Sequence, residues 1–199
     1  MKTPGMLAAS ALMALGSIGI SQAGQGAQTG QAAQPGQGAQ PGQGAQPGAQ
    51  PIHLSTHFDF ELDAPFSRAV LLFGPVSEQS WAGEHWEPVF FHPRPGKDIE
   101  GAVFTVVKGT HTSIWVNTLY DLPGGRMQYV AVIPGVVASL VDVKVSTLDA
   151  SRTRVDVTYS RTALDFAAND HVRELARQDA MSGPEWRSAI NASLSGAHR

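Results

Sequence analysis

The sequence contains no cysteine. No disulfide can therefore stabilise the fold, zinc sites built on cysteine are excluded, and a bacterial lipid anchor, which needs a cysteine after the signal, cannot form. The hydrophobic core has to stabilise the domain alone. A domain of roughly 150 residues buries about 68–70% of the surface that its unfolded chain exposes, so residues 52–199 are enough for one domain without cross-links.

Charge is also scarce. Without Lys2 there are 13 Lys and Arg against 17 Asp and Glu, a formal charge of −4, and neither sign forms a run. Nucleic-acid-binding domains carry a basic patch, and proteins that lie on anionic lipid carry a basic amphipathic helix. We therefore expect neither nucleic acid nor a membrane surface as a partner.

The N-terminal residues have the pattern of a cleavable export signal, predicted at residues 1–23. Lys2 supplies the positive start, an apolar stretch runs from Met6 to Ile20, and Ser21-Gln22-Ala23 provides the small residues of a cleavage site. A membrane-spanning helix needs about 20 predominantly apolar residues, and this stretch is shorter and contains two glycines. No twin-arginine pair precedes it, so we expect the general secretory route. The mature protein is then periplasmic or secreted, without a stable membrane anchor.

Residues 24–51 are a linker of Gln, Gly, Ala and Pro that has no charged or aromatic side chain. The hexapeptide Gln-Pro-Gly-Gln-Gly-Ala occupies 34–39 and again 40–45. Its glycines are alternately two and four residues apart, which excludes a collagen triple helix. Because the segment has few apolar side chains to bury, we expect it to be disordered.

Hydrophobic periodicity predicts mainly strands in the domain at 52–199. A strand at 53–63 is followed by short helices at 66–73 and 77–83, with Asp63 as the expected N-cap of the first. Asp121 is expected in a turn before Gly124-Gly125. In the clearest strand, Val141, Val143 and Val145 alternate with polar residues. The six further predicted strands cover 88–91, 102–108, 113–120, 127–133, 136–148 and 153–164.

A long helix is predicted at 169–194. Gly183-Pro184 interrupts it, and Ser182 with Glu185 would form a capping box that restarts the helix after a kink. This order of elements is typical of an α+β domain in which an antiparallel sheet curls around the final helix. The inner stripe of that helix is expected to be Val172, Leu175, Trp186, Ile190 and Leu194.

From Ser55 to Gly196 this pattern resembles the START-like (SRPBCC) superfamily, also called the helix-grip or Bet v 1-like fold. The resemblance is to uncharacterised bacterial members, and it implies a curved antiparallel sheet of about seven strands wrapped on a long C-terminal helix. This chain departs from them in its export signal, its linker and Gly183-Pro184. The segments that carry the resemblance are framework motifs: Phe73-Gly-Pro-Val-Ser-Glu78, Trp81, 101–105, Ile114-Trp115, 129–135, 153–159 and 162–164.

The resemblance also implies a cavity between sheet and C-terminal helix, used in the superfamily for lipids, sterols, polyketides, plant hormones or aromatic substrates. Some members are enzymes and many only bind or carry, and they share no catalytic residue set. The aromatic residues of this chain are either ordinary core or the walls of such a cavity, and the two interpretations overlap. The candidate ligand-binding residues are Trp81, Trp86, Phe91, His92, Phe104, Trp115, Tyr120, Tyr129, Tyr159 and Trp186.

Catalytic and metal signatures are missing from the sequence. There is no Gly-x-Ser-x-Gly elbow and no glycine-rich phosphate loop. His53 and His57 have a tempting spacing, but on a strand they would stand about 13 Å apart, too far to share one metal ion. We therefore predict no metal, no cofactor and no assigned catalytic residue.

Three functions are compatible with these observations. The first is an exported module that binds a small hydrophobic molecule, which predicts an apolar cavity of several hundred Å³; a space filled by Trp186, Ile190 and the valines would argue against it. The second is a cyclase- or hydrolase-type enzyme with His92 or a carboxylate as general acid or base inside the cavity. The third is a structural or interaction protein of the cell envelope, which predicts an exposed apolar patch without a pocket.

Overall fold

The computed structural model describes residues 50–196. The predicted signal peptide and residues 24–49 of the predicted linker lie outside the described residues. Within residues 50–196, no helix is long and apolar enough to cross a membrane.

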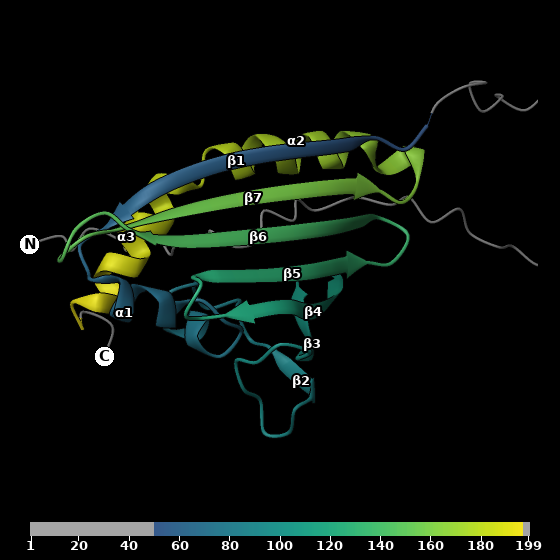
Figure 1. Ribbon diagram of the computed structural model, residues 1–199. Helices are drawn as coiled ribbons and strands as arrows, with labels where there is room; N and C mark the ends of the chain where they lie inside the picture. Colours follow the sequence, from purple (N-terminus) through teal and green to yellow (C-terminus); the bar gives the residue numbers. More distant parts are fainter. Residues whose placement is uncertain (1–49, 197–199) are drawn as a thin grey trace, which may run out of the picture.

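Seven strands form one antiparallel sheet in the order β1-β7-β6-β5-β4-β3-β2 (Figure 1). Strands β2 to β7 follow one another as a meander, and β1 closes the order by pairing with β7 along its whole length, from His53 opposite Thr162 to Leu62 opposite Thr153. The predicted antiparallel sheet of about seven strands is confirmed. The strands are β1 (His53–Leu62), β2 (Val89–His92), β3 (Val103–Lys108), β4 (His111–Asp121), β5 (Arg126–Ile133), β6 (Val137–Thr147) and β7 (Thr153–Ala163).

Alternation along the strands separates an inner from an outer face, as the periodicity predicts. On β6 the side chains of Val141, Val143 and Val145 are buried, and on β7 those of Val155 and Val157 are fully buried. Hydrophobic burial of one face therefore sets the register, because a slip by one residue would move each of these valines into water.

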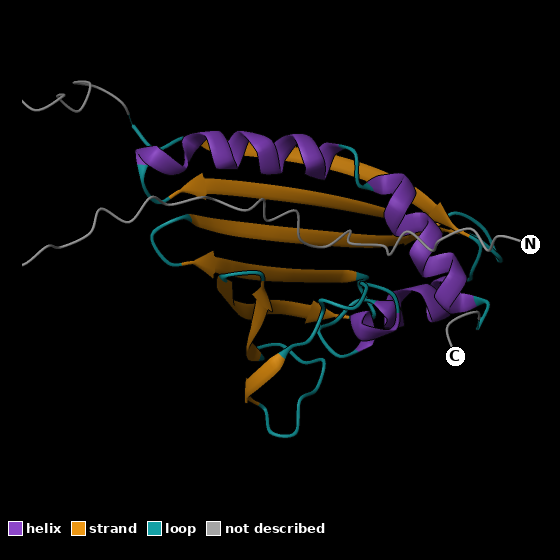
Figure 2. Ribbon diagram, turned by 180° about the vertical axis from the view of Figure 1, so that it is seen from behind, coloured by secondary structure: helices purple, strands orange, loops and turns teal. Residues whose placement is uncertain are grey.

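All helices lie on the inner face of the sheet or at its ends (Figure 2). Helix α2 runs along β1 and β7, and α3 turns away from it and packs on β1. The chain between β1 and β2 closes the other end of the inner face. The helices are α1 (Phe66–Ala69), η1 (Val70–Leu72), η2 (Ser77–Ser80), η3 (Phe166–Ala168), α2 (Asn169–Ala180) and α3 (Gly183–Leu194).

The C-terminal helix is two helices separated by Met181 and Ser182, so the predicted interruption is confirmed. The inner stripe is also confirmed in its position: Val172, Leu175, Trp186 and Ile190 are at most 1% exposed, and Leu194 packs against the core. Pro184 has no N–H for a helical hydrogen bond, which favours the start of a new helix at this point.

Two predicted helix caps are wrong. Ser182 precedes α3, but its Oγ donates to the carbonyl of Gln178 at 2.9 Å instead of accepting from the first turn. Asp63 does not cap α1, which starts after Pro65 with no side-chain cap. Asp63 instead accepts a long hydrogen bond from Asn191 of α3 at 3.4 Å. Ser182 thus bonds back to the last turn of α2, a local contact, whereas the partner of Asp63 is a tertiary contact.

Helix α2 is fastened to the sheet by a buried ion pair. Arg161 of β7 donates from Nε and Nη2 to Asp179 of α2 at 2.6 and 2.8 Å, and from Nη1 to Ser139 of β6 at 2.9 Å. Arg161 is 7% and Asp179 4% exposed. Because both charges are buried, removing one partner would leave the other uncompensated.

The outer face of the sheet is polar on one half and apolar on the other. Ion pairs lie on β1 and β7, such as Arg154 with Asp59 at 2.9 Å, and at the start of β5, where Arg126 pairs with Asp142 of β6 at 2.8 Å. On the other half, apolar residues of neighbouring strands stand directly opposite each other, and Ile114 and Leu140 are 43% and 37% exposed. The paired residues are Val103 with Val116, Val116 with Val130, Val130 with Leu140, and Ile114 with Val132.

Candidate functional site

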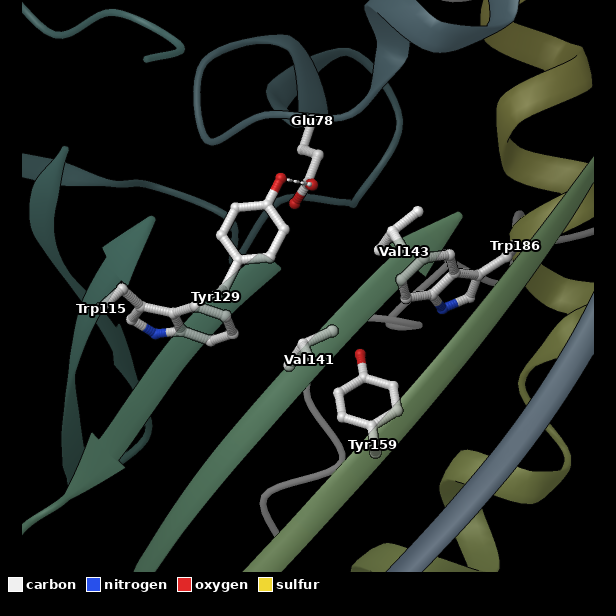
Figure 3. Close-up of a pocket in the computed structure, with 7 residues that line it drawn as sticks. All are labelled: Glu78, Trp115, Tyr129, Val141, Val143, Tyr159 and Trp186. Atoms are coloured by element: carbon white, nitrogen blue, oxygen red, sulfur yellow. Dashed lines mark hydrogen bonds between the residues drawn. The ribbon is translucent and has the colours of Figure 1, made fainter. Parts of the chain in front are cut away.

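A small cavity lies in the core between the inner face of the sheet and helix α3 (Figure 3). Its volume is about 10 Å³. That is room for about one water molecule. The lining residues are Glu78, Trp115, Tyr129, Val141, Val143, Tyr159 and Trp186.

The expectation of a cavity of several hundred Å³ is therefore wrong, and the filling around Trp186, Ile190 and the valines argues against a large-ligand form of the binding hypothesis. Large aromatic side chains occupy the concave side of the sheet, and their ring centroids lie 5–6 Å apart: Trp81 to Trp186 at 5.1 Å, Phe58 to Trp186 at 5.3 Å, and Trp86 to Trp115 at 5.5 Å. Ile190 is also fully buried. In this conformation the site excludes a lipid or a sterol.

Glu78 is the one carboxyl among the lining residues, and the loop after η1 positions it. The indole N–H groups of Trp81 and Trp86 donate to the carbonyls of Leu72 and Pro75 at 2.7 and 2.9 Å, which holds this loop against the core. The side chain of Glu78 then points inward, where it is 2% exposed.

Asp98 fixes the start of η2, the short helix that carries Glu78. Its carboxylate accepts from the backbone N–H of Val76 at 2.6 Å and of Ser77 at 3.0 Å, and from the Ser77 hydroxyl at 2.7 Å. The first two of these bonds satisfy backbone N–H groups that a helix start leaves without partners. Asp98 is 22 residues away from Val76 in the chain, so this support is a tertiary contact.

The Glu78 carboxyl has two hydrogen-bond donors. Its Oε1 accepts from the backbone N–H of Gly74 at 3.2 Å and from the hydroxyl of Tyr129 at 3.3 Å (Figure 3). Among the described residues no salt bridge includes Glu78. The carboxyl therefore has hydrogen bonds but no cationic partner.

Burial dominates the protonation of this group. Loss of hydration raises the pKa of Glu78 from its ordinary 4.5 to about 8, the nearby charge of Asp98 adds to the rise, and the Gly74 and Tyr129 hydrogen bonds oppose it. Burial and the proximity of Glu78 also raise the pKa of Tyr129 well above its usual range. At neutral pH the folded protein holds both groups in their uncharged forms.

The cavity walls combine aromatic rings with a few polar atoms. The Trp115 ring packs edge-on against Tyr129 with 6.2 Å between centroids, and its N–H donates to Ser113 at 2.8 Å. Trp186 is different, since its Nε1 is buried and has no hydrogen-bond partner among the described residues. Buried polar groups without partners are rare in proteins and point to a missing water or ligand.

Four of the ten candidate residues line the cavity: Trp115, Tyr129, Tyr159 and Trp186. Three more, Trp81, Trp86 and Phe104, are buried in the same hydrophobic cluster behind it.

Three candidates lie elsewhere. Tyr120 is partly buried, and its hydroxyl donates to the carbonyl of Phe73 at 3.1 Å. Phe91 and His92 are exposed on β2 and do not line the cavity. The short edge strand β2 has a register shift between Phe90 and His92, and Phe90 is the residue that packs inward on Phe104. Because His92 is exposed outside the cavity, it cannot be the general acid or base there, and that version of the enzyme hypothesis is wrong.

Sequence reasoning missed Glu78 as a site residue. It stands between Ser77 and Gln79 in a polar turn of 3-10 helix, where a glutamate is normally solvated. The only signal was its place at the end of the framework motif Phe73–Glu78. Burial of the residue depends on the sheet behind it, which local sequence does not describe.

The histidine pair on β1 behaves as strand geometry predicts. His53 contacts the Thr162 hydroxyl at 2.9 Å, and His57 lies 3.4 Å from the Asp156 carboxylate, so each histidine is paired with its own neighbour on β7. Within residues 50–196 no group of three or more His, Asp or Glu side chains is arranged to hold a metal ion.

No protein-family model and no curated protein matches this sequence. Solved structures do match. Norcoclaurine synthase from Thalictrum flavum, in complex with dopamine and hydroxybenzaldehyde, gives a TM-score of 0.54 at 12% identity, over 81% of this chain and 96% of that chain. An uncharacterised protein from Rhizobium leguminosarum gives 0.52 at 16% identity, over 71% and 96%.

A protein from Arthrobacter aurescens matches with a TM-score of 0.52 and 19% identity, over 72% of this chain and 87% of that one. This chain has the helix-grip, Bet v 1-like fold. At these identities the helix-grip likeness establishes the architecture, and the function has to be argued from the site itself.

Proposed function

We propose that this helix-grip protein is an exported binding module for one small, mainly apolar molecule about the size of a single aromatic ring. The observation that carries the proposal is the lining of the cavity, in which a buried carboxyl stands among Trp115, Trp186 and two valines. Small-molecule sites are mostly apolar concavities with a few placed polar groups. Because aromatic side chains fill most of the concave side of the sheet, the expected ligand is a compact molecule and not a lipid.

The unpartnered polar atom supports a ligand over a passive void. Trp186 Nε1 is a buried donor without an acceptor, and Glu78 is a buried carboxyl beside the same space. A bound molecule with a polar group would satisfy such atoms, which otherwise cost about 1–3 kcal/mol each when buried.

A ligand larger than water needs the cavity to open, and α3 is the element that could allow it. The break at Met181 and Ser182 separates α3 from α2, and α3 carries Trp186. Its side-chain hydrogen bonds to the rest of the domain are exposed and long: Arg68 to the Leu194 carbonyl at 3.3 Å, Asn191 to Asp63 at 3.4 Å, and Ser193 to Ser80 at 3.2 Å. The polar contacts of α3 therefore contribute little to holding it, and opening is opposed mainly by the apolar burial of Trp186 and Ile190.

The norcoclaurine synthase structure was solved with dopamine and hydroxybenzaldehyde, which are small aromatic molecules. That a helix-grip domain of the same architecture accommodates such molecules supports the proposed ligand size. The proposed export places binding outside the cytoplasm, where a carrier for a molecule met in the envelope or medium is a sensible role.

A second candidate is an enzyme that uses Glu78 as general acid or base. A carboxyl inside the cavity with its pKa moved to about 8 is the feature that this hypothesis predicted. Binding remains first because the other lining residues are two valines, two tryptophans and two tyrosines, and both tyrosines have pKa values raised by burial. No activated nucleophile therefore accompanies Glu78 in the lining.

The envelope-interaction hypothesis also has an observation in its favour, the apolar half of the outer sheet face. It predicted such a patch in a domain without a pocket, and here both are present. The cavity lining includes one buried polar atom without a partner, Trp186 Nε1, whereas nothing on the outer face indicates what would cover it, so the cavity carries the proposal.

The test is to produce the full chain in an exporting bacterial host and to analyse it by native mass spectrometry and solvent extraction. We expect a mature N-terminus at Gly24 and one bound small molecule on the wild-type protein, with Glu78→Gln carrying either the same molecule or none. A different molecule on the variant would indicate that Glu78 converts a substrate, which would favour the enzyme.

Tryptophan fluorescence then tests the cavity with benzyl alcohol as the probe. Binding should change the emission of Trp115 and Trp186, and Val141→Phe, which fills the cavity, should abolish the change. Val130→Phe, a matched substitution on the outer face, should leave it intact. Absence of any co-purified molecule, together with no response to the probe, would refute the proposed function.

A further inference from the structure

Glu78 is a buried acid that lacks a counter-ion. Its hydrogen-bond partners are the Gly74 N–H and the Tyr129 hydroxyl, both uncharged. The nearest charge that influences it is another acid, Asp98. An isolated buried charge is strongly unfavourable. A cation bound beside Glu78 would therefore stabilise the ionised form of its carboxyl.

Among the described residues, the buried cationic side chain of Arg161 is already paired with Asp179. Arg161 donates two hydrogen bonds to Asp179 at 2.6 and 2.8 Å, which neutralise its charge. Its guanidinium lies over the ring of Tyr159, 4.5 Å from the centroid. Tyr159, a wall of the cavity, therefore already shows within this molecule that its ring attracts a cation.

The remaining walls suit a cation equally well. Trp115, Tyr129, Tyr159 and Trp186 surround the space beside Glu78 (Figure 3). Aromatic faces attract ammonium groups, most strongly when water is excluded, and cages of such rings are a recurrent way to bind organic cations. A carboxyl added to such a cage provides charge neutralisation as well.

We propose that the ligand of this cavity is a small organic amine, whose ammonium group binds beside the Glu78 carboxylate and whose apolar part packs against Trp115 and Trp186. This inference rests on the proposed binding function and deepens it by naming the ligand class. A neutral apolar molecule would leave Glu78 protonated, as it is in the free protein, and an acid would bring a buried negative charge to a site without a cationic partner.

Binding of an amine must be linked to pH. Burial holds the pKa of Glu78 at about 8 in the free protein, so at pH 7 the carboxyl carries a proton that a bound ammonium would displace. Below that pKa the affinity for the amine should rise about tenfold per pH unit. The titratable groups that face Glu78 are Asp98, Tyr120, Tyr129 and Tyr159, and the pKa values of the three tyrosines are raised, so they stay neutral across this range.

The experiment compares three probes of matched shape on the full chain: benzylamine, benzyl alcohol and benzoate. Isothermal titration at pH 8 should give benzylamine an affinity at least about tenfold above benzyl alcohol, with no measurable binding of benzoate. Titrations at pH 7 in buffers of different ionisation enthalpy should show release of close to one proton with benzylamine and none with benzyl alcohol. This measurement needs no variant.

Glu78→Gln keeps the shape and the acceptor oxygen but not the charge. In this variant the preference for benzylamine and its pH dependence should disappear, while the affinity for benzyl alcohol changes by less than about threefold. Glu84→Gln is the matched control, because Glu84 is exposed and does not line the cavity. It should behave as wild type.

The outcomes separate the two proposals. If none of the three probes binds, the proposed binding function fails. If benzyl alcohol binds as tightly as benzylamine, or if Glu78→Gln retains the preference, the cavity binds small molecules but the amine assignment is wrong. Binding of benzylamine without proton release would likewise overturn the role given to Glu78.

Discussion

Replacing Glu78 by Gln should make the ligand-free protein more stable at neutral pH. The unfolded chain ionises this group near pH 4.5, whereas burial raises the pKa in the folded protein to about 8. Below pH 4.5 both states bind the proton and the group costs nothing. Between pH 4.5 and 8 the folded state keeps a proton that the unfolded state has lost, so the stability of the wild type falls as the pH rises.

The magnitude follows from the size of the shift. One pKa unit corresponds to about 1.4 kcal/mol, so the penalty reaches roughly 3 kcal/mol at pH 7 and levels off above pH 8. Glutamine does not ionise, and its side-chain oxygen can accept the same two hydrogen bonds from Gly74 and Tyr129. The variant should therefore gain stability relative to wild type by roughly 3 kcal/mol between pH 5 and pH 7.5.

Urea unfolding of wild type and Glu78→Gln at pH 5, 6, 7 and 7.5 measures this difference. Other titrating groups cancel in the comparison because both proteins contain them. Glu87→Gln, at an exposed position in the next loop, serves as the control and should show a constant difference near zero. Parallel stability profiles for wild type and Glu78→Gln would refute the conclusion that the buried carboxyl is held neutral.

Two further substitutions test the frame around the site. Arg161→Met should lower the free energy of unfolding by about 3–5 kcal/mol, because it leaves the buried Asp179 carboxylate without its cation. In urea unfolding, the double variant Arg161→Met with Asp179→Leu should recover most of that loss. Equal costs for the single and double variants would contradict this. Gly125→Ala should lower the thermal midpoint far more than Gly109→Ala. Both glycines have positive φ, at 66° and 59°, but only the Cβ at 125 would meet the carbonyl oxygen of Val145, and nothing lies within 4 Å of the one at 109.

Much of the fold could be predicted from the sequence because it depends on local periodicity. Each predicted strand in the domain is present with ends that differ by only a few residues, since alternation of apolar and polar side chains is itself the physical requirement for a sheet with one buried face. The helix break at Gly183-Pro184 is equally local, because proline lacks the N–H that a continuous helix uses.

The candidate site could be predicted only in part. The aromatic residues on β4, β5, β7 and α3 do converge, because strand alternation points Trp115, Tyr129 and Tyr159 to one face and the helical stripe points Trp186 toward it. Phe91 and His92 do not line the cavity: Phe91 alternates with the inward-facing Phe90, and a register shift after Phe90 places His92 opposite Val103. A shift of this kind depends on the neighbouring strand and has no local signature.

The sequence alone determined the class of the domain, its strand order along the chain, the face that each strand buries and the absence of disulfides, because all of these follow from residue type and spacing. Only the tertiary structure decided how full the cavity is, since volume depends on how side chains from distant strands interdigitate. It also decided that Glu78 is buried without a counter-ion. The charge state of a group is set by everything that surrounds it in space, and here those surroundings come from Gly74, Asp98 and Tyr129, which lie close to Glu78 only after folding.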